Sequence, residues 1–329
     1  MLKWHLAPTS NREEDEGRPR RMDGRSPPLM DTHAFHPDLR RAAPWLPRAA
    51  VRPRTLKAIR LSTGLLARIP RKGVTVEALG PISVRVHRPA SSPGPLPALL
   101  WIHGGGYVIG SAAQDDAVCR RFADGLGMVV AAVEYRLAPE HRFPVPLHDC
   151  HDALVWLAGQ PTVDPTRVAV GGASAGGGLA AALGVLARQR GEVPLAFQLL
   201  AYPMLDDRTA ARTDIDESNF RLWNNGANRF GWQSYTGHRP GSDEVSGLAA
   251  PSRLDDLAGL PPAWIGVGTL DLFHDEDLAY ARRLREAGVE CELDVVEGAF
   301  HGFDLVRAKA GVSRAFRSSQ LAALGAALR

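Results

Sequence analysis

The sequence predicts an α/β protein in which a mostly parallel central sheet carries helices on both faces. Its 329 residues are 45% hydrophobic and 23% charged, the composition of a globular chain large enough for a full core. Short, continuous apolar runs bounded by Gly and Pro are typical of parallel strands buried on both faces. Segments of helical periodicity separate these runs, and an antiparallel hairpin pattern precedes them, so repeated βα units are expected.

The N-terminal residues 1–30 differ from the rest of the chain, because they are rich in charged residues, Pro and Gly. Such a segment cannot bury enough apolar area to offset the entropy lost on ordering. We expect a disordered tail or a misassigned start, since Met22 and Met30 offer later initiators. The segment also lacks the apolar stretch of a signal peptide. Residues 31–329 are then expected to form a single domain.

The expected strands follow a Pro-interrupted helical segment, 36–69. Apolar and polar residues alternate over 74–79 and 82–89, and the intervening Gly80-Pro81 predicts a hairpin. Six buried strands are expected after it, over residues 97–105, 127–136, 166–174, 195–203, 261–269 and 291–298.

Two helices are well marked. Residues 174–189 place Leu179, Leu183 and Leu186 on one face. Residues 275–287 begin with three acidic residues, carry arginines near their end and stop at Gly288, as the helix dipole and a C-terminal glycine cap favour.

The polar segment 204–247 interrupts this alternation and is too long for a plain connection. We expect it to form, together with 36–69, a helical cap over the carboxyl edge of the sheet. Its aromatic side chains are suited to wall an apolar cleft of limited depth. The expected pocket residues are Trp223, Phe230, Trp232 and Tyr235.

Charge and cysteine content exclude several classes of protein. The net charge is +3 and no Lys/Arg tract is present, so no nucleic-acid partner is expected. No apolar run is long enough to span a membrane. The three cysteines match neither a disulfide framework nor a zinc pattern, and we expect a cytoplasmic protein without a metal.

The strongest catalytic motif is Gly172-Ala173-Ser174-Ala175-Gly176, a G-x-S-x-G sequence between an apolar strand and an apolar-faced helix. This context is that of a nucleophile elbow, in which a tight turn exposes the serine hydroxyl at a helix N-terminus. A flexible turn is the alternative, but the flanking elements and the surrounding glycines favour Ser174 as nucleophile.

The second motif, His103-Gly104-Gly105-Gly106, ends the third expected strand. Backbone N–H groups of Gly104, Gly105 and Gly106, with that of Ala175, are expected to form an oxyanion hole. A phosphate-binding loop is the alternative, but the required helix start and lysine do not follow.

The base and the acid should follow the serine in the order acid then histidine. Asp271 and His301 lie after strands at the edge that carries Ser174, and Asp275 is a rival for the acid. The remaining candidates are better explained as core, surface or helix-start residues: His141, His148, His151 and His274.

Taken together, the chain resembles the hormone-sensitive-lipase-like esterases, bacterial family IV, of the α/β-hydrolase fold. The similarity spans about residues 36 to 325. The resemblance implies Ser174 as nucleophile, His301 as base and Asp271 as acid. Ala173 departs from the Asp or Thr usual there, which bears on substrate preference. Five blocks carry the resemblance, HGGG (103–106), YRLAPEHRFP (135–144), GASAGGG (172–178), DLFHDED (271–277) and FHGF (300–303).

The predicted function is therefore a serine carboxylesterase that cleaves short-to-medium acyl esters through an acyl-enzyme, with no cofactor. The same triad would also serve an amide, thioester or formamide. Some relatives in the family are non-catalytic receptors of small molecules, but those lack the histidine base, so His301 argues against that function. The resemblance is also compatible with a homodimer through the last strand and the C-terminal helix.

Overall fold

The computed structural model describes residues 32–49, 51–67, 71–89 and 94–329. Within these residues, eight strands form one sheet in the order β1-β2-β4-β3-β5-β6-β7-β8. Only the pairings β1–β2 and β2–β4 are antiparallel, which confirms the predicted hairpin and the mostly parallel sheet. The strands are β1 (Val74–Leu79), β2 (Ile82–His87), β3 (Leu96–Ile102), β4 (Val129–Glu134), β5 (Val163–Ala173), β6 (Leu195–Ala201), β7 (Ala263–Leu270) and β8 (Cys291–Phe300).

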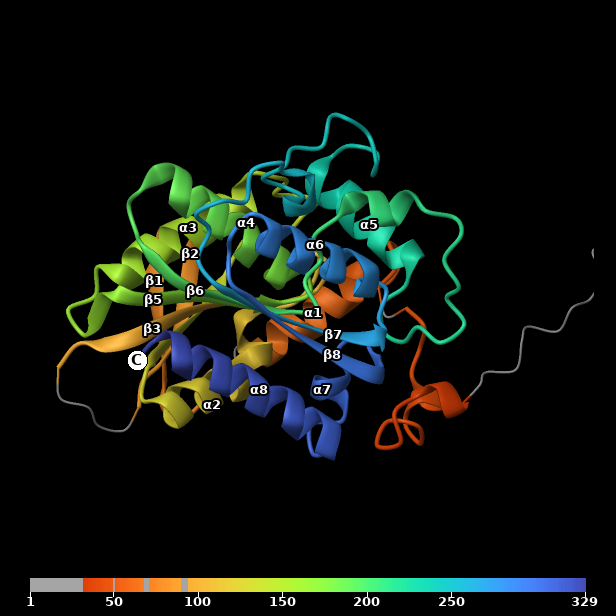
Figure 1. Ribbon diagram of the computed structural model, residues 1–329, viewed down its shortest axis with the longest axis horizontal. Helices are drawn as coiled ribbons and strands as arrows, with labels where there is room; N and C mark the ends of the chain where they lie inside the picture. The colour runs from red at the N-terminus through yellow and green to blue at the C-terminus, as the bar shows by residue number, and fades with distance from the viewer. Residues whose placement is uncertain (1–31, 50, 68–70, 90–93) are drawn as a thin grey trace, which may run out of the picture.

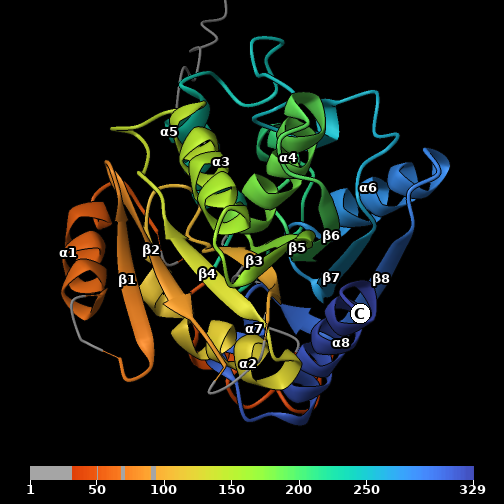
Figure 2. The same ribbon diagram turned by 90° about the vertical axis from the view of Figure 1, so that its left-hand side faces the viewer.

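Helices cover both faces of the sheet, as predicted. Figure 2 shows α3 and α4 on one side of the sheet and α2 and α8 on the other. The helices are α1 (Leu56–Ala67), α2 (Asp116–Leu126), α3 (Val145–Ala158), α4 (Ala175–Arg190), α5 (Asn225–Thr236), α6 (His274–Glu286), α7 (Phe303–Val306) and α8 (Gly311–Ala327). The two helices marked most clearly in the sequence, 174–189 and 275–287, correspond to α4 and α6. The expected disordered tail, 1–30, lies outside the described residues.

The strand β3 shows why the central strands are apolar throughout. Leu100 and Ile102 belong to the apolar cluster formed with α3 and α4, whereas Leu99 and Trp101 belong to the cluster formed with α2 and α8. Successive side chains of a strand point to opposite faces, so a strand covered on both sides is apolar at every position.

The predicted strand 97–105 is too long at its end, because β3 stops at Ile102. Residues 103–106 leave the sheet as a loop, and the end of β3 lies directly beside the end of β5 in a parallel pairing. The two motifs singled out in the sequence therefore meet at one edge of the sheet.

Segments 36–69 and 204–247 both contribute to that edge. In Figure 1, the red-orange residues from 32 to 49 lie beyond the arrowheads of β7 and β8, and α5 lies above these strands. The two segments also touch each other, because Arg221 donates through Nε to the Ala43 carbonyl at 2.7 Å and Leu222 N–H donates to the Pro47 carbonyl at 2.8 Å. Much of 204–247 is loop rather than helix, since α5 is its one α-helix in the described residues.

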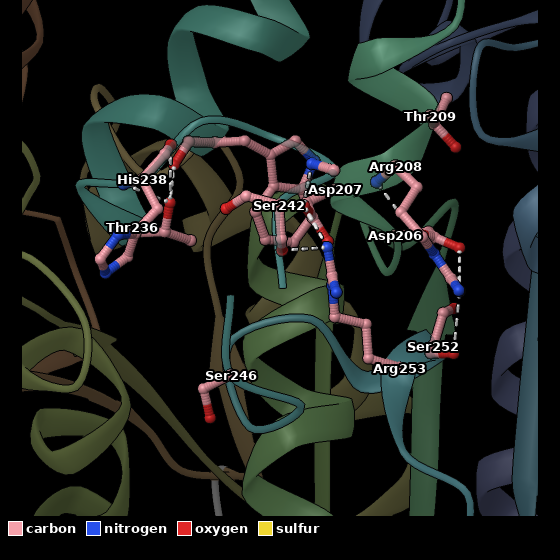
Figure 3. A network of polar contacts seen from close by, with 12 residues as sticks. Asp206, Asp207, Arg208, Thr209, Thr236, His238, Ser242, Ser246, Ser252 and Arg253 are labelled. Atoms are coloured by element: carbon pink, nitrogen blue, oxygen red, sulfur yellow. Dashed lines mark hydrogen bonds and ion pairs between the residues drawn. The ribbon is translucent and has the colours of Figure 1, made fainter. Parts of the chain in front are cut away.

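A polar network joins the start of the long connection between β6 and β7 to residues further along the same connection (Figure 3). Arg253 donates to Asp207 through Nε at 2.6 Å and Nη2 at 3.0 Å, and the N–H of Gly241 donates to the same carboxylate at 2.6 Å. Because Asp207 is fully buried, these charge-assisted bonds offset the cost of removing its charge from water. The connection is therefore held at both of its ends.

Candidate active site

Ser174 lies at the sharp turn between β5 and α4, with φ 56° and ψ −123°. A positive φ is uncommon for a residue with a side chain and is held here by the surroundings. The N–H of Ser174 donates to the Ala201 carbonyl at 2.9 Å, and its own carbonyl accepts from Gly178 and Met204. A Cβ at Gly176 would lie 2.0 Å from the Ile102 carbonyl oxygen, so only glycine allows the helix to start this close to β3.

The Ser174 hydroxyl is the first member of a hydrogen-bonded chain of three side chains. Its Oγ lies 3.0 Å from Nε2 of His301, and Nδ1 of His301 lies 2.8 Å from Oδ2 of Asp271. All three residues are buried, with exposed fractions of 6%, 8% and 3%. They come from the ends of β5, β7 and β8, three strands far apart in the sequence.

Asp271 is fixed by the backbone as well as by the histidine. Its Oδ1 accepts from the N–H of Phe273 at 3.0 Å, so both carboxylate oxygens are engaged. The rival Asp275 lies on α6, where its carboxylate pairs with His274 at 3.0 Å and with Arg212 at 3.3 Å. Its side chain is 72% exposed. The structure therefore brings Asp271, and not Asp275, to His301.

Aromatic rings hold the His301 imidazole from two sides. Tyr202 and Phe273 both meet it edge to face, with ring centroids 4.9 Å and 5.2 Å away. The Tyr202 hydroxyl in turn donates to Oδ1 of the buried Asp304 at 2.8 Å. Tyr202 directly follows β6 at the same edge of the sheet. Its position after an apolar strand could have identified it from the sequence as a residue of the site, although it belongs to none of the motifs.

The loop 103–106 faces Ser174 from the end of β3. Gly105 has φ 128°, and a Cβ there would lie 2.1 Å from the Ile109 carbonyl oxygen, so the loop depends on glycine at this position. His103 packs beneath the loop, with its ring stacked on Tyr135 at 4.3 Å. Burial lowers the pKa of His103 to about 4, although its hydrogen bond to the Gly104 carbonyl opposes this effect. The ring is therefore neutral near pH 7 and supports the loop without adding charge.

Ala175, the fourth expected oxyanion residue, is the first residue of α4 and is fully buried. The N–H groups of a helix's first turn have no acceptor within the helix. Its N–H is thus placed at the positive end of the α4 dipole, next to the nucleophile.

A cavity of about 290 Å³ opens onto these groups. Gly104, Gly105, Gly106, Ser174 and His301 line it together with side chains that are mostly apolar. The remaining lining residues are Val51, Ile109, Gln114, Asp115, Ala173, Tyr202, Leu222, Trp223, Gly302, Leu305 and Val306. A larger hollow, between α2 and α8, holds none of the predicted site residues.

The predicted pocket wall is only partly right. Trp223 lines the cavity, but Phe230, Trp232 and Tyr235 do not. Trp232 and Tyr235 are fully buried, and they pack with Tyr107 in the core at centroid distances of 5.4 Å and 4.0 Å. Phe230 is half-buried against the same core. The prediction was wrong for these three because the aromatic side chains of α5 pack into the core, around Tyr107, rather than into the cleft.

Among the described residues, no group of three or more His, Cys, Asp or Glu side chains is arranged to hold a metal ion. The same part of the chain contains no helix that is both long and apolar enough to cross a membrane.

Comparisons with known proteins agree with this geometry. Residues 99–305 match the model of a family described as alpha/beta hydrolase fold. The chain is 36% identical to carboxylesterase NlhH of Mycobacterium tuberculosis over 255 residues, covering 72% of this chain and 75% of that protein. It is 35% identical to esterase LipI of the same species over 244 residues, covering 68% and 71%.

The structure also matches a solved bacterial heroin esterase, with a TM-score of 0.81 and 40% identity. That match covers 91% of this chain and 99% of the other. The chain belongs to the hormone-sensitive-lipase-like esterases of the α/β-hydrolase fold. As a member of this family it is a carboxylic ester hydrolase, which confirms the class of reaction predicted from the motifs.

Proposed function

We propose that this esterase cleaves short-to-medium acyl esters with Ser174 as nucleophile, His301 as general base and Asp271 as the acid that orients the base. The observation that carries the proposal is the hydrogen-bonded chain from Ser174 through His301 to Asp271 at the wall of the cavity. In this order of groups, the carboxylate fixes the imidazole tautomer and stabilises the imidazolium.

In the first half of the reaction, Ser174 Oγ bonds to the ester carbonyl carbon while its proton passes to His301 Nε2. The carbonyl electrons move onto oxygen, where the N–H groups of the loop Gly104–Gly106 and of Ala175 stabilise the charge. The tetrahedral intermediate then collapses, the carbon–alkoxy bond breaks, and His301 returns the proton to the leaving alcohol.

In the second half, water attacks the acyl-enzyme as its proton moves to His301. The bond between the acyl carbon and Ser174 Oγ breaks, and the proton returns to the serine as the carboxylic acid leaves. Each proton transfer uses the same nitrogen, which already lies 3.0 Å from the serine oxygen. No further group is needed to balance either half.

The preference for short-to-medium chains rests on the size and lining of the cavity. At about 290 Å³ it lies at the small end of ligand sites, and its walls include Val51, Leu222 and Trp223. Each methylene buried there contributes about 0.8 kcal/mol until the cavity is full. Longer chains must remain in water or displace the covering segments, so the rate should then fall.

The test is a series of p-nitrophenyl esters from acetate to palmitate, compared by kcat/KM. We expect a peak in the short-to-medium range. A profile that rises steadily to palmitate, with activation on emulsified triglyceride, would contradict a closed cleft of this size.

Two features outside the cavity support further parts of the proposal. β8 is an edge strand of the sheet, and Val295 on it is 41% exposed, as a homodimer interface through β8 and α8 would require. We propose this dimer. We also propose a cytoplasmic location, which is supported by the three unpaired cysteines, Cys119, Cys150 and Cys291. Light scattering on the purified protein tests the first, and a monomer at micromolar concentration would contradict it.

A further inference from the structure

Among the described residues that line the Ser174 cavity, Asp115 is the one carboxylate. It ends the short 3₁₀ helix Ala112–Asp115, which follows the glycine loop and is held by reciprocal hydrogen bonds between Ser111 and Gln114. The residue borders the cavity and is only 2% exposed. Neither the triad nor the oxyanion hole makes use of it.

The Asp115 carboxylate is only half satisfied. Its Oδ2 accepts a hydrogen bond from Nε1 of Trp101 at 2.9 Å, while no described residue donates to Oδ1. Asp304, the nearby buried acid, is better compensated. It accepts from the Tyr202 hydroxyl at 2.8 Å and is stabilised by the charges of Arg317 and Arg121.

Arg317 and Arg121 border the same small hollow as Asp115, but in the described residues neither makes an ion pair with it. Burial raises the pKa of Asp115 to about 7, and the negative charges of Asp304 and Asp116 act in the same direction, with only the Trp101 bond opposing them. The groups around it on the neighbouring elements are Arg121, Arg317, Tyr202 and Asp304. A buried carboxylate is costly unless it is paired with a positive charge or fully hydrogen-bonded.

The other side chains that line the described part of the cavity carry no positive charge, so none of them pairs with Asp115 or competes with a bound cation for it. No Lys or Arg is among the lining residues in the part of the chain that the structure describes, so a cation that enters meets no repulsion from these residues. Trp223 and Tyr202 line the same space, and aromatic faces attract a cation in addition to an opposite charge. The partner that the site lacks is therefore a small positively charged group that arrives with the substrate.

We propose that Asp115 forms a subsite for a protonated amine carried by the ester substrate, with its free Oδ1 accepting the N–H of that amine while Ser174 attacks the carbonyl. This inference rests on the proposed function, since it names the substrate class of the same site. It makes Asp115 a specificity-determining residue rather than a member of the triad.

The test uses two pairs of esters in which a protonated nitrogen replaces a CH group of the same shape. One pair carries the amine on the alcohol, 2-(dimethylamino)ethyl butyrate against 3-methylbutyl butyrate. The other carries it on the acid, ethyl 3-(dimethylamino)propanoate against ethyl 4-methylpentanoate. The kcat/KM ratio within each pair is measured at about pH 8, where Asp115 is mostly ionised. Taking the ratio removes any general loss of activity in a variant.

The natural chain should prefer the amine of at least one pair by about tenfold or more, as expected for a hydrogen bond to a buried charge. Asp115→Asn should bring that ratio close to one, because asparagine can keep the Trp101 bond but carries no charge. Asp124→Asn is the matched control: it makes the same change of charge on α2, where the side chain is 58% exposed, and should leave both ratios unchanged.

Equal ratios in the natural chain and Asp115→Asn for both pairs would overturn the amine subsite. If the neutral esters are hydrolysed in that case, the proposed function stands without it. If none of the four esters is hydrolysed by the natural chain, the proposed function fails and the subsite with it.

Discussion

The two sides of the cavity are built differently. At the reacting centre, Ser174, Asp271 and His301 follow strands β5, β7 and β8 of the sheet, are at most 8% exposed and form one hydrogen-bonded chain. By contrast, Leu305 and Val306 of α7, which also line the cavity, are 47% and 39% exposed. The reacting groups are thus held by the sheet, whereas this wall can change without disturbing them.

Because the two parts of the wall are held differently, we expect one to determine the reaction rate and the other to determine which substrates are preferred. Groups that must be placed to within a fraction of an ångström are set by strand ends and by close backbone packing, as at Gly176. Groups that only exclude water and limit length are placed on connecting segments, where substitutions cost little. Changes on the sheet side should therefore alter rate, and changes on the covering side should alter substrate preference.

The largest effect is expected from Ser174→Ala and His301→Ala. Each should lower kcat by about a thousandfold or more, and the double variant should be hardly worse, because the members of a triad act as a unit. Thermal unfolding should change little in Ser174→Ala, since the hydroxyl contributes little packing. Losses that multiply in the double variant would show that the two side chains act independently.

The next effect separates Asp271 from Asp275. Asp271→Asn should lower kcat by about a hundredfold to ten-thousandfold, because the amide cannot hold the same imidazole tautomer. Asp275→Asn removes only an exposed pairing with His274 and Arg212, so activity should stay near that of the natural chain. The opposite ranking would move the acid to α6.

Two tryptophans test the covering side. Trp223→Ala should shift the acyl-chain optimum toward longer esters, because the ring lines the cavity beside Gly106. Trp232→Ala should leave the optimum in place but destabilise the fold by about 3–5 kcal/mol, because that ring is fully buried in the core. Acyl-chain-length profiles and denaturant unfolding of both variants test this. If the profile shifted only in Trp232→Ala, then Trp232 and not Trp223 would form the cavity wall.

The smallest effect is expected at the outer wall. Leu305→Ala should broaden the profile toward bulkier acyl groups by less than about tenfold in kcat/KM, since the side chain is half exposed and little apolar contact is lost. Stability should be nearly unchanged. A loss as large as that of Ser174→Ala would mean that α7 positions His301 rather than only covering the cavity.

The sheet and the triad could be predicted from the sequence because their signals are local. An apolar run followed by glycine marks a strand end, and parallel strands bring their carboxyl ends to one edge, so Ser174 and His301 could be brought together without coordinates. The resemblance also indicated Asp271 as the acid, but Asp275 lies only four residues away, and the orientation of the two side chains in the structure distinguishes them.

The pocket wall could not be predicted in the same way. Aromatic residues of α5 are equally suited to a cleft or to a core, and the direction of each depends on how the helix is rotated against the sheet. Trp232 and Tyr235 turned inward, whereas Val51, from a segment more than a hundred residues earlier, lines the cavity. Asp115 carries no motif at all, and only its burial and its unpaired oxygen identify it.

The central claim is that Ser174 is a nucleophile activated by its neighbours, and covalent labelling tests it most directly. The protein is treated with a fluorophosphonate, digested and mapped by mass spectrometry, without any assumption about the substrate. We expect one adduct, on the peptide that contains Ser174, lost in Ser174→Ala and formed far more slowly in His301→Ala. An adduct on another serine, or one that persists in Ser174→Ala, would contradict the account.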